Sequence, residues 1–67
     1  MNLFVNDIVE SISDSFTSGE KFKITNLKTI SGKLHATIIS IRDENSEFTV
    51  ALSVLEDKNR FKVVKKF

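Results

Sequence analysis

The chain has 67 residues and a formal net charge of +1, with six phenylalanines, one histidine and no cysteine. A chain of this length forms one small domain, residues 1–67, that buries only about 60% of the surface its unfolded form exposes, so homodimerisation would help to stabilise it. The lack of cysteine excludes disulfides, Cys/His zinc sites and Cys-His catalysis. No apolar run is long enough for a signal peptide or a membrane span, so we expect a cytoplasmic protein with no membrane partner.

Residues 3–16 are predicted to form an amphipathic helix. Phe4, Ile8, Ile12 and Phe16 recur every four residues, which would align them along one stripe of a helix. The opposite face would be acidic, which does not suit a DNA groove or an anionic membrane. We therefore expect this helix to cover a hydrophobic core.

Three other segments have the pattern of strands. Residues 20–24 alternate charged and apolar side chains over a length that suits an edge strand. Residues 47–55 alternate apolar and polar side chains, which predicts a central strand with one buried face. Residues 60–67 continue the alternation, and polar turn-forming clusters at 43–46 and 56–59 separate these segments.

The stretch between residues 25 and 42 is compatible with either a helix or a strand. Apolar side chains recur at helical spacing at Leu27, Ile30, Leu34, Ile38 and Ile41. Against a helix, residues 37–41 are rich in β-branched side chains, which favour sheets. We favour a strand over 34–42 that pairs with 47–55. The predicted fold is α+β, with the N-terminal amphipathic helix packed on a three- to four-stranded antiparallel β-meander.

We expect the apolar faces of the predicted helix and strands to pack into a single core. Its expected members are Phe16, Phe22, Phe48 and Phe61, together with Ile8, Ile12, Val50 and Leu52.

If residues 33–43 are instead helical, the chain resembles a winged-helix DNA-binding domain. The resemblance lies in the element order: helix (3–16), short strand (21–24), short helix (25–30), second helix (33–43) and hairpin (47–66). The segment from Gly19 to Leu27 is similar to the passage from the first helix through a strand to the second helix in such domains. The resemblance implies a groove-facing side that includes Lys33, His35, Thr37 and Arg42, and a wing with Lys58 and Arg60.

Charge is arranged in blocks along the sequence. Residues 1–20 carry four acids and no base, and residues 21–42 carry five bases and no acid. Residues 43–57 carry five acids and no base, and residues 58–67 carry five bases and no acid. Such segregation can produce a dipolar surface, although neighbouring elements can also neutralise one another.

No residue pattern indicates an enzyme, a metal site or a cofactor. His35 is the single histidine, and Gly19 and Gly32 are isolated, so no phosphate-cradling loop is present. A calcium loop beginning at Asp43 would lack its required glycine. Binding therefore remains as the expected activity.

We expect a small nucleic-acid-binding accessory or regulatory protein. The candidate contact residues are Lys21, Lys23, Lys33, His35, Arg42, Lys58, Arg60, Lys62 and Lys66. The alternative is an inhibitor or adaptor of the phage or mobile-element type that binds a larger protein through an acidic helix face or a sheet edge. A structural subunit that acts by self-association is a third hypothesis.

Overall fold

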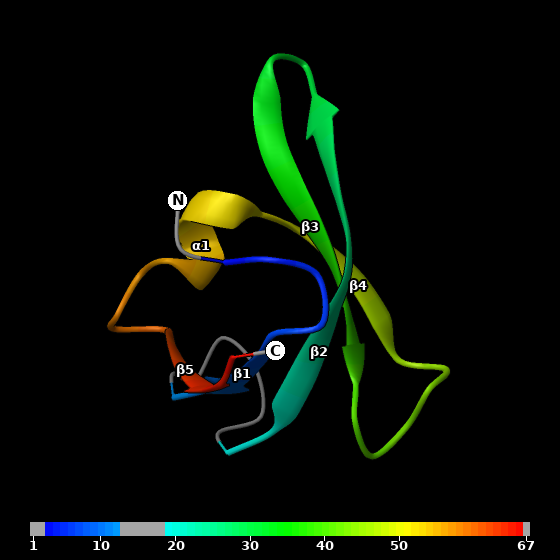
Figure 1. Cartoon of the computed structure of the whole chain (residues 1–67), viewed down its shortest axis with the longest axis vertical. Helices are drawn as coiled ribbons and strands as arrows, with labels where there is room; N and C mark the ends of the chain where they lie inside the picture. Colours follow the sequence, from blue (N-terminus) through cyan, green and yellow to red (C-terminus); the bar gives the residue numbers. More distant parts are fainter. Residues whose placement is uncertain (1–2, 13–18, 67) are drawn as a thin grey trace.

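The computed structural model describes residues 3–12 and 19–66, and within them the protein is mainly β (Figure 1). The strands are β1 (Ile8–Ser11), β2 (Lys21–Ile30), β3 (Lys33–Ser40), β4 (Glu47–Ala51) and β5 (Phe61–Lys65), and the short helix α1 spans Leu52–Leu55. They form an antiparallel sheet in the order β4-β3-β2-β1-β5. The last strand therefore returns to pair with the first.

The helix predicted over residues 3–16 is wrong. Asn6 has a φ of 79°, a left-handed conformation that a right-handed helix cannot contain. The next residue, Asp7, accepts a hydrogen bond from the backbone N–H of Phe4 at 3.0 Å, which fixes a turn at this point. β1 follows, with Val9 fully buried. Ile8, a β-branched residue of the expected helical stripe, lies in this strand, and residues 13–16 lie outside the described residues.

The α+β fold class is wrong for the same reason, and so is the winged-helix resemblance. A winged-helix domain needs several helices, whereas the described residues form five strands and the four-residue helix α1. The segment proposed as a recognition helix, residues 33–43, contains β3. The β-branched side chains of this segment favour extended backbone.

The prediction of a strand over residues 34–42 is confirmed for most of its length. β3 pairs with β4, with Ile38 opposite Phe48 and Ala36 opposite Val50. The strand predicted over 47–55 ends at Ala51, where the chain enters α1, and β4 lies at an edge of the sheet.

The segment predicted as a short edge strand is the longest strand of the sheet. β2 has ten residues and lies between β1 and β3. Ser31 and Gly32 connect β2 to β3, with φ values of 51° and 80°. Positive φ at both central residues gives a two-residue turn whose twist matches that of paired strands. The β2–β3 hairpin extends beyond the rest of the chain (Figure 1).

One apolar cluster lies on the inner side of the sheet. Its buried members are Leu3, Val9, Phe22, Ile24, Ala36, Ile38, Leu52, Leu55 and Phe61. The Phe22 ring lies 6.4 Å from the ring of Phe61 and 5.9 Å from that of Phe48, in edge-to-face geometry.

The predicted core was correct in part. Phe22, Phe61 and Leu52 are buried, and Val50 packs against the cluster. The other predicted members differ: Phe48 and Ile12 are exposed, Ile8 lies on the outer side of β1, and Phe16 is outside the described residues. Residues 3–12 and 19–66 contain no helix long and apolar enough to cross a membrane.

Candidate nucleic-acid interface

The strand register brings lysines from two distant parts of the sequence onto one face of the sheet. In β1, Val9 is buried, so its neighbours Ile8 and Glu10 point to the outer face. Ile8 and Glu10 each lie opposite a lysine on both adjacent strands. We define the lysine face by these four residues: Lys21 and Lys23 on β2, and Lys62 and Lys65 on β5.

Glu10 lies between two of these lysines. Its carboxylate oxygens are each 3.9 Å from an ammonium nitrogen, one that of Lys21 and the other that of Lys62. The Glu10 side chain is 20% exposed, whereas the two lysine side chains are more than half exposed. Such long, solvated ion pairs contribute little stability. The lysine face thus keeps a surplus of positive charge, with two of its lysines positioned by a shared carboxylate.

The second row of the lysine face has an apolar residue at its centre. Ile8 lies between Lys23 and Lys65, and the three residues line a shallow hollow together with Asn6. Neither lysine has a carboxylate within ion-pair distance among residues 3–12 and 19–66. These two ammonium groups are therefore the best placed on the lysine face to meet an external anion.

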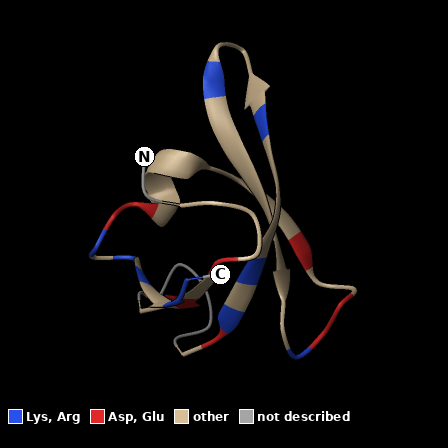
Figure 2. Cartoon of the chain, viewed as in Figure 1, with Lys and Arg blue, Asp and Glu red and all other residues tan. Residues whose placement is uncertain are grey.

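Further basic residues extend this face along the β2–β3 hairpin. Lys28 lies opposite His35 in the strand register. In the neighbouring pair, Leu27 lies opposite Ala36, which is buried. Side chains alternate along a strand, so Lys28 and His35 point to the outer face. Lys33 is exposed at the start of β3, and its carbonyl oxygen lies 2.9 Å from Nδ1 of His35. Figure 2 shows basic residues at both ends of β2 and along β5.

Three of the predicted contact residues lie in loops and not in the two rows of the lysine face. Arg42 follows β3 in the loop to β4, and Lys58 lies in the loop between α1 and β5. The Nε atom of Arg60 is 3.4 Å from a carboxylate oxygen of Asp57, in the same loop. The structure thus places Lys58 and Arg60 in one loop and Arg42 in another.

Lys66, a fourth predicted contact residue, is engaged within the protein. Its ammonium group donates a hydrogen bond to the buried carboxylate of Asp7 and lies 5.2 Å from the centre of the Phe4 ring. The predicted residues that share the outer face are therefore Lys21, Lys23, Lys33, His35 and Lys62.

Two outward-facing lysines were not among the sequence candidates: Lys65 of the lysine face and Lys28 of the β2–β3 hairpin. Strict alternation would place Lys65 on the opposite side of β5 from Lys62, but the register shifts between Ile8 and Val9, and this bulge returns Lys65 to the outer face. A second shift, between Ile24 and Asn26, does the same for Lys28. The sequence signal for these residues is weak, since no glycine marks either bulge.

Among the described residues, no three or more His, Asp or Glu side chains lie where they could hold a metal ion. No family model matches the chain, and no curated protein or solved structure matches it significantly.

Proposed function

We propose that the protein binds nucleic acid through the lysine face, as a small non-enzymatic accessory or regulatory protein. The observation that carries this proposal is the register of β1 with β2 and β5. It joins lysines of the basic blocks 21–42 and 58–67 on one surface. Lysines that neutralise phosphates release condensed counterions, and this release drives binding that does not depend on sequence.

The composition of the lysine face favours contact with phosphates over contact with bases. The residues between the lysines are Ile8 and Glu10, so neither row offers an aromatic ring on which a base could stack. Lysine also acts as a point charge and lacks the planar fork with which arginine recognises guanine. We therefore expect binding to duplex backbone with little sequence preference.

The spacing of the lysines suits a duplex. β2 and β5 are separated by β1, so their lysines lie about 10 Å apart at the backbone. The grooves of B-DNA are about 6 and 12 Å wide, and extended lysine side chains can adjust their span to phosphates on both sides of a groove. In this arrangement β1 faces the groove.

Fluorescence anisotropy with a labelled duplex of about 20 base pairs, at about 50 and 150 mM salt, tests this proposal. The informative variant is Lys23→Glu/Lys65→Glu. Its matched control is Arg42→Glu/Lys58→Glu, which changes the net charge by the same amount in two loops. We expect the first variant to bind at least tenfold more weakly, with the slope of log affinity against log salt smaller by about two units.

The control is expected to lose less than about threefold in affinity, because neither side chain belongs to the rows of the lysine face and exposed charges outside them are screened by salt. Equal losses in the two variants would show that net charge alone attracts DNA. Undetectable binding of the parent at the lower salt concentration would contradict the proposed function.

A further inference from the structure

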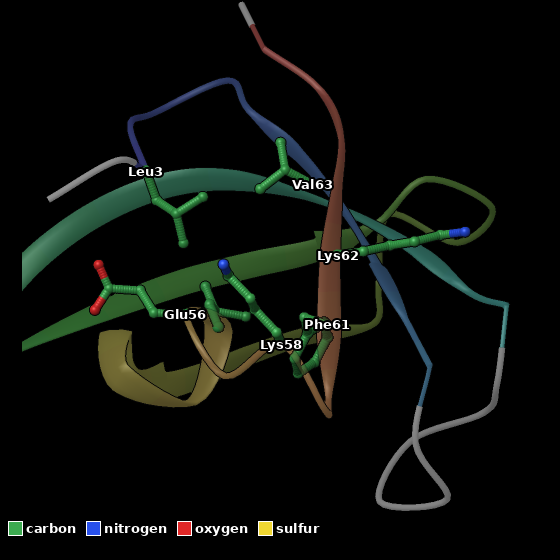
Figure 3. A pocket seen from close by; sticks show the side chains of 7 residues that line it. Leu3, Glu56, Lys58, Phe61, Lys62 and Val63 are labelled. Atoms are coloured by element: carbon green, nitrogen blue, oxygen red, sulfur yellow. The ribbon is translucent and has the colours of Figure 1, made fainter.

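A groove of about 410 Å³ lies beside β5, between this strand, α1 and the N-terminal segment (Figure 3). Its apolar lining consists of Leu3, Leu55, Phe61 and Val63. Glu56, Lys58 and Lys62 complete the lining. In Figure 3 the side chain of Lys62 extends away from Phe61, so the groove and the lysine face lie on different sides of β5.

The strand that borders this groove is an edge of the sheet. β5 pairs with β1 on one side, and among the described residues its other side has no strand partner. Two apolar side chains of β5 remain in contact with solvent: Val63 is 45% exposed and Val64 is 39% exposed. An open strand edge beside an apolar groove is the arrangement to which an extended peptide binds by strand addition.

The charges around the groove and along β5 indicate what kind of segment fits. The described lining of the groove has two lysines, Lys58 and Lys62, and one acid, Glu56, and Lys65 lies further along β5 on the lysine face. A second copy of the chain that paired β5 with β5 would bring the lysines of the two strands close together, which is unfavourable. An acidic segment would instead meet charges of opposite sign.

We propose that β5 and this groove bind an extended segment of another protein in which acidic and apolar residues alternate. The backbone of that segment adds a strand to the free edge of β5, an apolar side chain enters the groove, and acidic side chains lie near Lys58 and Lys65. The inference shares Lys65 with the lysine face, but the apolar groove lies on the other side of β5, so shifts at the groove distinguish it from the proposed nucleic-acid binding.

An NMR titration of the ¹⁵N-labelled protein with two synthetic octapeptides tests the inference. One peptide alternates glutamate with leucine, and the other alternates lysine with leucine. We expect the acidic peptide to shift the amide signals of Leu55, Phe61 and Val63. We expect the basic peptide to bind at least about tenfold more weakly.

Two single variants locate the site. Val63→Asp is expected to weaken binding of the acidic peptide about tenfold, because it places a carboxylate beside the groove and removes an apolar contact. Lys58→Glu is expected to weaken it about threefold, and the loop control Arg42→Glu to leave it unchanged. Because all three side chains are exposed, the variants should retain the amide dispersion of the parent.

Equal affinity for the two peptides would overturn the inference, as would shifts centred on Lys21 and Lys23 in place of the groove. So would the absence of binding at about 1 mM peptide. A concentration-dependent dimer that Val63→Asp abolishes would identify a second copy of the chain as the occupant, contrary to the proposal.

Discussion

Lys66 donates a hydrogen bond to the carboxylate of Asp7, which lies 59 positions earlier in the chain. The Asp7 side chain is only 2% exposed, whereas that of Lys66 is half exposed. The same carboxylate accepts a hydrogen bond from the backbone N–H of Phe4. Asp7 thus joins the turn before β1 to the segment that follows β5, and Lys66 has a structural role that the sequence did not indicate.

Lys66→Met should destabilise the protein by about 1–2 kcal/mol, because a buried carboxylate loses a charged partner while the methionine keeps the apolar stem. Urea unfolding followed by circular dichroism measures this free energy. The control is Lys65→Met, which changes an exposed lysine on the lysine face and should cost less than about 0.5 kcal/mol. Equal stability of the two variants would argue against a structural role for the Asp7–Lys66 pair.

The two phenylalanines in edge-to-face contact should differ in their contributions to stability. Phe22 is 1% exposed and also contacts Phe61, whereas Phe48 is 40% exposed. Phe22→Ala should cost about 3–5 kcal/mol, comparable to the whole stability of a small domain. Phe48→Ala should cost about 1–2 kcal/mol. Thermal melts of the two variants test this order, and a Phe48 variant as unstable as the Phe22 variant would place Phe48 in the core.

The turn between β2 and β3 offers a stabilising substitution. Ser31 has a φ of 51°, and serine adopts the left-handed region less readily than asparagine does. Ser31→Asn, which creates the Asn-Gly pair preferred in such turns, should stabilise the protein by about 0.5 kcal/mol and raise Tm by about 2–4 °C. Gly32→Ala should lower Tm, since φ at that position is 80°. A lower Tm for Ser31→Asn would contradict this assignment of the turn.

How much of this architecture the sequence could predict depends on the segment. β3 was predictable because its β-branched residues outweighed a competing helical spacing. β1 was not, because Phe4, Ile8 and Ile12 have helical spacing, and the buried Asp7 in the turn before β1 is bonded to Lys66, far along the chain. Sequence periodicity contains no information about a partner so far along the chain.

The sequence could identify basic residues of the candidate site, but it could not show that they share one surface. The two basic blocks identified Lys21, Lys23 and Lys62, but their convergence depends on β5 pairing with β1. The position of Lys65 depends in addition on a bulge that reverses the alternation of side chains. Register and bulges arise from tertiary packing, which strand periodicity does not specify.

Glu10 should limit the affinity of the lysine face for phosphate. Its carboxylate lies 3.9 Å from the ammonium groups of both Lys21 and Lys62, where it competes with an external anion. Glu10→Gln removes this charge with little change in shape and should strengthen duplex binding about threefold to tenfold at low salt. Glu47→Gln, an exposed acid on β4, is the control and should change affinity by less than about twofold. A Glu10→Gln variant that binds no better than the control would exclude this competition.

The measurement that tests the central claim most directly is an NMR titration of the ¹⁵N-labelled protein with unlabelled duplex DNA. If β2, β1 and β5 present one binding face, the largest shifts should fall at Ile8, Glu10, Lys23 and Lys65, and they should diminish as salt rises. Shifts centred on the loops that contain Arg42 and Lys58, or no shifts at low salt, would contradict binding through the lysine face.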